Sequence, residues 1–224
     1  MEKRLIITVD GPAGAGKSTI SKILAGRLSY IYLDTGALYR AVASKVAENE
    51  VSADDERQLS DLCAEIKISL RSIDNDISIF VDDEDVTEKI RTQEIGMLAS
   101  KISAVPVVRG TLLSIQRKTG KDGGIVAEGR DMGTVVFPDA DFKFFLDAGV
   151  AERSKRRFTE LVEKGESAEI EDVKRDLMIR DKQDSERGIA PLKPSMDSIV
   201  IDSTDMSIVD VVEKIIRIIG GKNL

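Results

Sequence analysis

Gly11-Pro12-Ala13-Gly14-Ala15-Gly16-Lys17-Ser18 fits the pattern GxxxxGK[ST] of a phosphate-binding loop, or P-loop. The apolar run Leu5–Val9 before it predicts a buried strand, and the run Ser18–Leu28 after it predicts a helix. In such a unit, backbone N–H groups surround a phosphate and the helix N-terminus adds partial positive charge. We expect Lys17 to bridge the outer phosphates of a nucleoside triphosphate and Ser18 to ligate Mg²⁺. A glycine-rich turn that fits by chance is the alternative, but it leaves the flanking strand and helix unexplained.

The composition is that of an ordinary globular protein. The 224 residues are 42% hydrophobic and 33% charged, which allows one large domain or a core with a small insertion. Histidine is absent and Cys63 is the only cysteine, so histidine-based catalysis, histidine metal sites and an internal disulfide are excluded. We expect Cys63 to pack rather than react.

Charge and hydropathy narrow the class of protein further. A net charge of −7 argues against binding nucleic acid through a broad basic surface. No apolar run approaches the ~18 residues of a membrane span, and the run near the N-terminus is too short for a signal peptide. We therefore expect a cytoplasmic protein that binds neither nucleic acid nor membrane, and we expect a monomer.

Short apolar runs alternate with helical patterns along the chain. Such runs are typical of parallel strands that are buried on both faces. The order predicts a doubly wound α/β fold with a five-stranded parallel sheet and ligands at the carboxyl ends of its strands. The predicted strands are Leu5–Val9, Ile31–Leu33, Ile125–Ala127, Phe142–Leu146 and Ile199–Ile201. The predicted helices are Ser18–Leu28, Leu38–Asn49, Gln93–Ala104, Val107–Thr119, Ala151–Lys164, Ile170–Glu186 and Ser207–Ile219.

One stretch breaks this order. Ile66–Leu70 and Ile77–Val81 alternate at period two around Asp74-Asn75-Asp76, which predicts a β-hairpin, and Asp82–Thr87 could add a turn and a short edge strand. An antiparallel edge on the main sheet is the alternative to a separate subdomain. The predicted organisation is a core of residues 1–62 and 99–224 with a small inserted subdomain at residues 63–98.

Two further loops carry polar side chains at the ends of predicted strands. Asp34-Thr35-Gly36 would make a tight turn that places Arg40 on the next helix, opposite the P-loop. The same Asp-Thr pair could cap that helix, and the two roles are compatible. In the segment Ala127–Thr134, two glycines flank Arg130-Asp131 where ligands sit in open α/β sheets. An accidental surface turn is the alternative.

Arginines cluster on two predicted helices near the end of the chain. Their spacing puts each set on one helix face, which also suits a solvated surface laced with salt bridges. The P-loop favours a functional interpretation, because phosphoryl transfer depends on positioning and on stabilising negative charge. The residues are Arg153, Arg156 and Arg157 on the first helix, and Arg180, Asp184 and Arg187 on the second.

Taken together, these segments resemble the bacterial cytidylate kinases. The resemblance covers nearly the whole chain and implies a P-loop NTPase fold with LID helices at about residues 153–188 and an inserted subdomain that binds the nucleoside monophosphate. It implies transfer of the γ-phosphoryl group of ATP to CMP or dCMP, with Mg²⁺. The matching segments are the P-loop, Leu33–Arg40, Ile-Arg-Thr-Gln-Glu at 90–94, Gly-Arg-Asp-Met-Gly-Thr-Val-Val-Phe-Pro-Asp at 129–139 and Ala-Pro-Leu at 190–192.

The resemblance also implies a role for each matching residue. ATP would be held by Gly11, Pro12, Ala13, Gly14, Ala15, Gly16, Lys17, Ser18 and Thr19, with Arg153 and Arg157 over its phosphates. The acceptor phosphate would be held by Arg40, Arg130 and Arg187, and the ribose side by Thr35, Arg180 and Asp184. The cytosine edge would be read by Ser100, Arg109 and Asp131. The implied catalytic residues are Lys17, Arg130, Arg153 and Arg187. Some family members carry Ser at position 35, which keeps the hydroxyl.

Two other classes of protein compete with this interpretation. Another small-substrate P-loop kinase, for a different nucleoside monophosphate or for shikimate, would keep the P-loop but would not explain residues 129–139 together with the insertion. A GTP-dependent switch would carry an Asn-Lys-x-Asp guanine signature, and no such string occurs.

Overall fold

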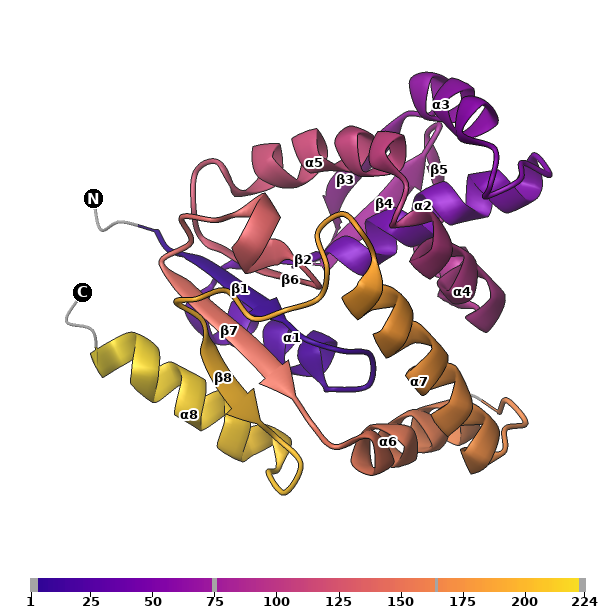
Figure 1. Cartoon of the computed structure of the whole chain (residues 1–224). Coiled ribbons are helices and arrows are strands. Elements are labelled where there is room, and N and C mark those ends of the chain that lie inside the picture. Colours follow the sequence, from indigo (N-terminus) through magenta and orange to yellow (C-terminus); the bar gives the residue numbers. More distant parts are fainter. Residues whose placement is uncertain (1–3, 74–75, 164, 222–224) are drawn as a thin grey trace.

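Five parallel strands form the main sheet, in the order β2–β6–β1–β7–β8 (Figure 1). The computed structural model describes residues 4–73, 76–163 and 165–221. All five predicted strands are present, so this part of the fold is confirmed. Their bounds are β1 Ile6–Asp10, β2 Ile31–Asp34, β6 Ile125–Gly129, β7 Phe142–Asp147 and β8 Ile199–Asp202.

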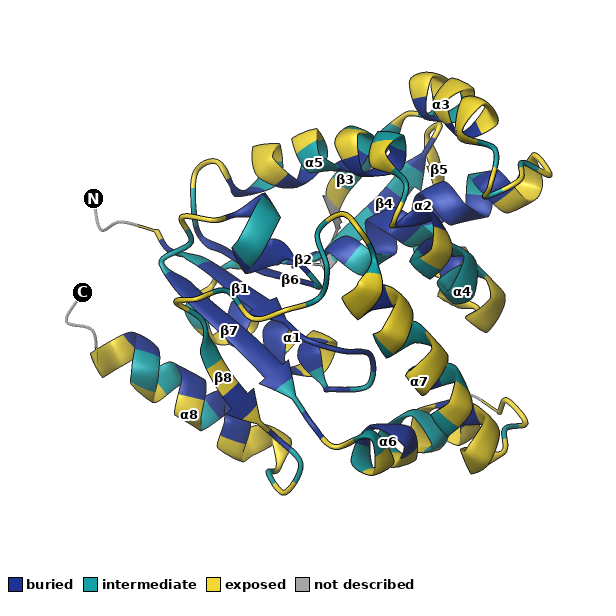
Figure 2. Cartoon of the chain, in the orientation of Figure 1, coloured by how far each residue is buried: buried dark blue, intermediate teal, exposed yellow. Residues whose placement is uncertain are grey.

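Helices cover both faces of this sheet. One apolar core joins the sheet to α2, α3 and α5, and a second joins it to α1 and α8. Figure 2 shows the central strands as the most buried part of the molecule. This confirms the doubly wound arrangement, because each face of the sheet has its own apolar cover. The helices are α1 Lys17–Leu28, α2 Thr35–Glu48, α3 Glu56–Glu65, α4 Gln93–Ile102, α5 Pro106–Gly120, α6 Val150–Glu163, α7 Ile170–Glu186 and α8 Ile208–Gly221.

All seven predicted helices are present, with ends that differ by up to three residues. The predicted last residue of α6, Lys164, lies outside the described residues. An eighth helix, α3, contains the run around Cys63, and the thiol is buried in the first core as expected. Asp55 caps α3 by accepting the N–H groups of Arg57 and Gln58 at 3.0 Å each.

The period-two segment forms its own antiparallel sheet. β3 Ile68–Ile73, β4 Asp76–Val81 and β5 Glu84–Asp85 pair in that order and are not hydrogen-bonded to the main sheet. The alternative of an antiparallel edge on the main sheet is therefore wrong. Of the expected turn, Asp74 and Asn75 lie outside the described residues. The sheet packs on α2 through an apolar cluster, while the boundaries of the inserted subdomain remain a prediction.

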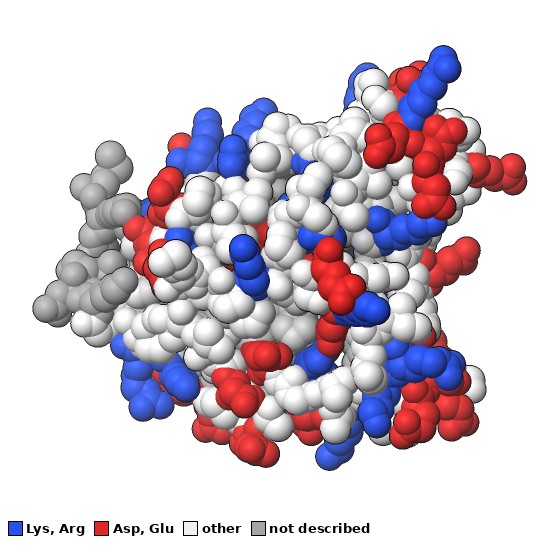
Figure 3. Space-filling model, viewed as in Figure 1, with Lys and Arg blue, Asp and Glu red and all other residues white. Residues whose placement is uncertain are grey.

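The surface carries mixed charge. On the face in Figure 3, acidic and basic side chains are interspersed without one broad basic area. Within the described residues, no single helix is long and apolar enough to cross a membrane; α4 and α5 pass that test only together, as a pair bent by 102°.

Candidate nucleotide-binding site

The P-loop leaves the central strand at the carboxyl edge of the sheet. Its glycines adopt positive φ angles, +148° at Gly11, +75° at Gly14 and +91° at Gly16, which L-residues with side chains rarely adopt. The Lys17 ammonium donates to the carbonyl oxygen of Pro12 at 2.7 Å, so the lysine side chain folds back onto the P-loop backbone. Burial, followed by the charge of Arg130, lowers the pKa of Lys17 to about 7. The charged form of such a buried lysine is strongly stabilised when an anion binds next to it.

Two pockets meet at this lysine. The deep pocket has a volume of about 180 Å³, and the P-loop pocket beside it about 320 Å³. Both are lined by Lys17, Ser18, Asp34, Arg40, Gly96 and Arg180. The deep pocket is lined further by Thr35, Gly36, Tyr39, Ala99, Ser100, Ser103, Glu128, Gly129, Arg130, Asp131, Asp184 and Arg187. The P-loop pocket is lined further by Ala13, Gly16, Thr19, Arg91, Thr92, Gln93, Arg157, Glu160 and Leu177.

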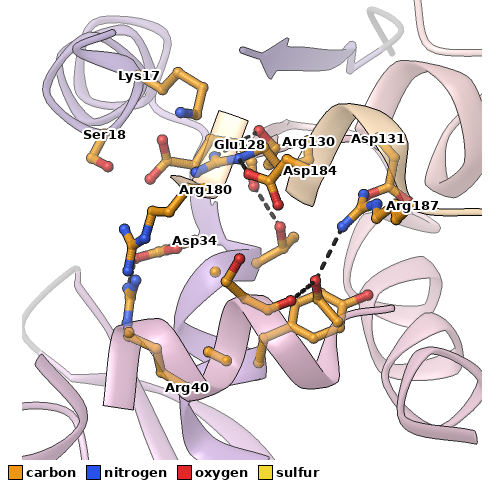
Figure 4. Close-up of a pocket in the computed structure, with 18 residues that line it drawn as sticks. Lys17, Ser18, Asp34, Arg40, Glu128, Arg130, Asp131, Arg180, Asp184 and Arg187 are labelled. Atoms are coloured by element: carbon orange, nitrogen blue, oxygen red, sulfur yellow. Dashed lines mark hydrogen bonds and ion pairs between the residues drawn. The ribbon is translucent and has the colours of Figure 1, made fainter. Parts of the chain in front are cut away.

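The two ends of the deep pocket differ in chemistry. Figure 4 shows Ser18 and Arg180 at one end, and Asp131 and Arg187 at the other. At the second end, the Asp131 carboxylate is buried between two arginines: it pairs with Arg109 through Oδ2 and accepts from Arg187 through Oδ1 at 3.4 Å. This end therefore presents a fixed set of donors and acceptors to whatever enters.

Unsatisfied positive charge gathers at the first end. Arg40 pairs with Asp34 at 2.9 Å and Arg130 with Asp184 at 2.7 Å, but Arg180 has no ion pair of this kind among the described residues. The Nε atoms of Arg40 and Arg180 are buried, and neither has a hydrogen-bond partner in the described part of the chain. In Figure 4 their guanidinium groups face each other. Burial lowers the pKa of Arg180, and the charge of Arg130 lowers it further. An anionic ligand would offset both the burial of these guanidinium groups and the repulsion between them and Arg130.

Most of the implied substrate residues come together in these pockets. The Thr35 hydroxyl donates to the backbone carbonyl of Glu128 at 2.7 Å, which ties the end of β2 to β6. Ser100 lies on the α4 side of the deep pocket, and its hydroxyl is 3.4 Å from Oε1 of Gln183. Arg109 does not line the deep pocket itself, but it forms an ion pair with Asp131, which does. Arg157 faces the P-loop pocket and pairs with Glu160 at 2.7 Å.

Arg153 is placed differently from the implied role. Its buried guanidinium donates to the Ala13 carbonyl at 3.0 Å and pairs with Asp181 at 2.7 Å. It lines neither pocket, and instead ties the P-loop to α6 and α7. Arg187 also lies away from Ser18, at the Asp131 end (Figure 4). Neither guanidinium therefore lies at the junction of the two pockets in this structure.

Three further polar side chains beside the pockets escaped the sequence interpretation. Asp10, the last residue of β1, accepts the N–H groups of Met132 and Gly133 at 2.8 Å each. These groups begin a π-helical turn at Met132–Val136, which the sequence did not predict. The other two are Glu128 and Tyr32, which hydrogen-bond each other beside Ser18. The position of Asp10 and Glu128 directly before two glycine motifs was the available signal.

Glu128 is held as a buried carboxylate. It is 3% exposed, its Oε1 accepts from the Tyr32 hydroxyl, and the Ser18 hydroxyl lies beside it. Burial, and next the charge of Asp34, raise the pKa of Glu128, while Lys17 opposes them.

The fold and the two pockets define a P-loop phosphotransferase with room for a second substrate beside the P-loop. The comparison with known families gives the particular one: the family model for cytidylate kinase matches residues 7–220, and the chain belongs to that family. It is therefore a kinase.

Curated relatives agree along the whole chain. This chain is 48% identical to the cytidylate kinase of Citrifermentans bemidjiense, over 95% of this chain and 91% of that one. It is 46% identical to the cytidylate kinase of Carboxydothermus hydrogenoformans, over 97% and 98%. Among solved structures, an uncharacterized protein from Eubacterium ventriosum is similar, with a TM-score of 0.50 and 16% identity over 98% of this chain and 99% of that one. At that identity the likeness supports the fold alone.

Proposed function

We propose that this enzyme transfers the γ-phosphoryl group of ATP to CMP or dCMP, giving CDP or dCDP and ADP. Membership of the cytidylate kinase family supports the reaction. The observation that carries it is that the P-loop pocket and the deep pocket meet at Lys17, Ser18 and Arg180. A triphosphate in one and a monophosphate in the other would bring their phosphates together at that junction.

The chemistry needs alignment more than proton abstraction. An oxygen of the acceptor phosphate attacks the γ-phosphorus, and the bond from that phosphorus to the bridging oxygen of ADP breaks. The attacking oxygen is already anionic, so positioning supplies much of the rate. Lys17 and Arg130 stabilise the negative charge that spreads in the transition state. Arg153 and Arg187 complete the proposed catalytic set after lid movement.

The P-loop suits Mg²⁺. This cation takes few protein ligands and binds phosphate oxygens and water besides. The Ser18 hydroxyl lines both pockets and would hold it, and the buried Glu128 side chain lines the deep pocket next to it. Across the described residues there is no cluster of three acidic or cysteine side chains that could hold a metal by itself. When bound, Mg²⁺ neutralises charge on the transferring phosphates.

Asp131 is proposed to select cytosine. Cytosine presents an amino donor where uracil presents a carbonyl acceptor, and a carboxylate suits only the former. Each carboxylate oxygen can accept more than one hydrogen bond, so Asp131 could keep Arg109 and Arg187 while it accepts from the base. Asp184 would meet the ribose together with Arg180, which also borders the junction of the two pockets, and Arg40 and Arg130 would hold the acceptor phosphate.

Release of ADP from ATP, coupled to a spectroscopic assay, tests this function. CMP, dCMP, UMP, AMP and shikimate are offered separately. We expect CMP and dCMP to be preferred, and UMP to lose about 1–3 kcal/mol in kcat/KM, because its carbonyl would face the Asp131 carboxylate. Equal efficiency with UMP and CMP would contradict the role of Asp131, and turnover of shikimate alone would contradict the function.

The oligomeric state and location follow from composition only. We propose a monomeric, cytoplasmic enzyme with no nucleic-acid partner, and light scattering after size exclusion would test the first of these.

A further inference from the structure

Ser103 lies at the corner between α4 and α5, and no step of the proposed reaction uses it. It directly follows the last residue of α4, its side chain is buried, and it lines the deep pocket. Its backbone N–H donates to the Ala99 carbonyl oxygen at 3.0 Å, so the helix fixes the position of this residue.

Ser103 makes hydrogen bonds to three residues of the proposed acceptor site. Its hydroxyl donates to the Ser100 carbonyl oxygen at 2.7 Å and accepts from Nη1 of Arg187 at 3.2 Å. A serine hydroxyl can do both at once, because it has one donor and two acceptor positions. Its backbone carbonyl oxygen accepts from Nη1 of Arg109 at 3.2 Å. One residue therefore connects α4 to α5 and to the end of α7.

The charges around Asp131 explain why these neutral acceptors matter. Arg109 and Arg187 both form an ion pair with Asp131, so one carboxylate is shared by two positive charges. Burial lowers the pKa of Arg187, the charge of Asp131 opposes this effect, and the charge of Arg109 lowers the pKa further. The side chain of Arg187 is only 4% exposed, so water cannot replace an acceptor that the protein withdraws.

The Ser103 hydroxyl is the side-chain link from α4 to the Arg187 guanidinium. Nε of Arg187 donates to the Ala190 carbonyl oxygen at 2.6 Å, and Nη2 donates to Oδ1 of Asp131 at 3.4 Å (Figure 4). Ala190 belongs to the same segment as Arg187 and would move with it, and 3.4 Å is a long hydrogen bond. Without the hydroxyl, Arg187 could turn away and release one side of the Asp131 carboxylate.

We propose that Ser103 is a specificity-determining positioning residue, whose hydroxyl holds Arg187 against Asp131 and so fixes the carboxylate that accepts from the cytosine amino group. This rests on the proposed function, in which Asp131 reads the base. Because Arg187 is assigned to the phosphates only after lid movement, Ser103 sets the arrangement that the acceptor meets first. It therefore acts on acceptor affinity and leaves the chemical step unchanged.

A packing role for Ser103 makes a different prediction. If the hydroxyl did no more than satisfy the Ser100 carbonyl oxygen at the end of α4, its removal would affect CMP and UMP alike. A positioning role predicts a loss that is confined to the cytosine nucleotide, because UMP does not use the Asp131 carboxylate as an acceptor.

The test compares wild type with Ser103→Ala, Ser103→Thr and Ser44→Ala. Calorimetry gives the Kd of CMP and of UMP without ATP, and the ADP-release assay gives kcat and KM for both acceptors and for ATP. Ser103→Ala removes the hydroxyl, whereas Ser103→Thr keeps it. Ser44→Ala is the matched control, because the buried Ser44 hydroxyl makes the same kind of bond within its helix, to the Ala41 carbonyl oxygen at 2.9 Å.

We expect Ser103→Ala to raise the Kd and the KM for CMP about 10-fold, the effect of losing a hydrogen bond to a charged group. The constants for UMP, the KM for ATP and kcat should stay close to those of wild type, and retained UMP binding shows that the variant is folded. The preference for CMP over UMP should therefore fall about 10-fold. Ser103→Thr should keep most of the preference, and Ser44→Ala all of it.

The inference is overturned if Ser103→Ala keeps the CMP affinity and the preference, or loses CMP and UMP equally. It is also overturned if Ser44→Ala shows the same loss, or if Ser103→Thr loses as much as Ser103→Ala, because the hydroxyl would then not be the cause. A wild type that does not phosphorylate CMP would instead contradict the proposed function, and one that accepts UMP equally would contradict the role of Asp131; the inference fails with either.

Discussion

At the scale of single residues, the site depends on charges that are buried before any substrate arrives. Lys17 is 7% exposed, and its ammonium donates a hydrogen bond to the Pro12 carbonyl oxygen. Lys17→Ala should leave the fold intact, because it removes a buried cation whose solvation is poor, and should lower kcat at least ~100-fold, as loss of one charged stabiliser of a transition state does. Steady-state kinetics and thermal unfolding check this against Lys214→Ala, an exposed position on α8. Near-normal kcat would mean that the loop binds something incidental.

Asp10 links the P-loop strand to the turn that carries Arg130 and Asp131. Burial raises its pKa to about 6, against the opposing effect of the Gly133 and Met132 N–H groups. Between its ordinary value of 3.8 and about 6, the native state therefore binds more protons than the unfolded chain, and stability falls as pH rises through that window.

The Asp10→Asn variant lacks this titration. The free energy of unfolding of wild type, relative to the variant, should fall by about 2 kcal/mol between pH 4 and pH 6, at 1.36 kcal/mol per pKa unit. Urea unfolding at several pH values measures the difference. A difference that stays level across the window would show that the carboxylate is solvated in the native protein.

At the scale of elements, the P-loop is pressed against a neighbouring strand. A Cβ atom on Gly11 would lie 1.9 Å from the Leu146 carbonyl oxygen of β7, whereas one on Gly16 would meet open space. Both glycines have positive φ, so alanine at either position carries backbone strain of about 1–2 kcal/mol. Only Gly11→Ala adds the overlap, which we expect to cost at least ~2 kcal/mol more in the free energy of unfolding. An equal loss of unfolding free energy in the two variants would mean that the Leu146 backbone of β7 moves aside without an energetic penalty.

Elements with a strong local pattern were predictable from the sequence. Continuous apolar runs such as Phe142–Leu146 mark buried parallel strands, and the glycine motif identifies the loop after β1. The π-helical turn at Met132–Val136 was not predictable, because its first turn depends on a residue far away in the sequence. The backbone N–H groups of Met132 and Gly133 donate hydrogen bonds to the carboxylate of Asp10. The pairing of Arg153 with Asp181 was missed for the same reason: it joins two helices whose packing no local pattern specifies.

At the scale of the whole molecule, the arginines assigned to one reaction come from separate elements. α7 lies between α6 and α4 (Figure 1). A small apolar cluster of Ala13, Leu161, Val173 and Leu177 attaches α6 and α7 to the P-loop. The side-chain hydrogen bonds from α7 to α4 are exposed: Gln93 to Asp176 at 2.9 Å and Ser100 to Gln183 at 3.4 Å. Such contacts separate at low cost, so α7 can move against α4 while it stays anchored at the P-loop.

Like charges around the junction of the two pockets oppose its closure. Arg40 and Arg180 face each other there, and Arg157 and Arg91 line the same P-loop pocket. Two bound nucleotides would neutralise this repulsion, exclude water and draw Arg187, α6 and α7 toward the phosphates, as lid closure does in kinases. We therefore expect ATP with a non-reacting CMP analogue to increase protection from hydrogen exchange in residues 153–188 and 63–98, with α8 as the internal control. ATP alone should protect the first segment more than the second, because the P-loop pocket borders α6 and α7. Unchanged protection in both segments would mean that the site is preformed and that Arg153 and Arg187 act from where they stand.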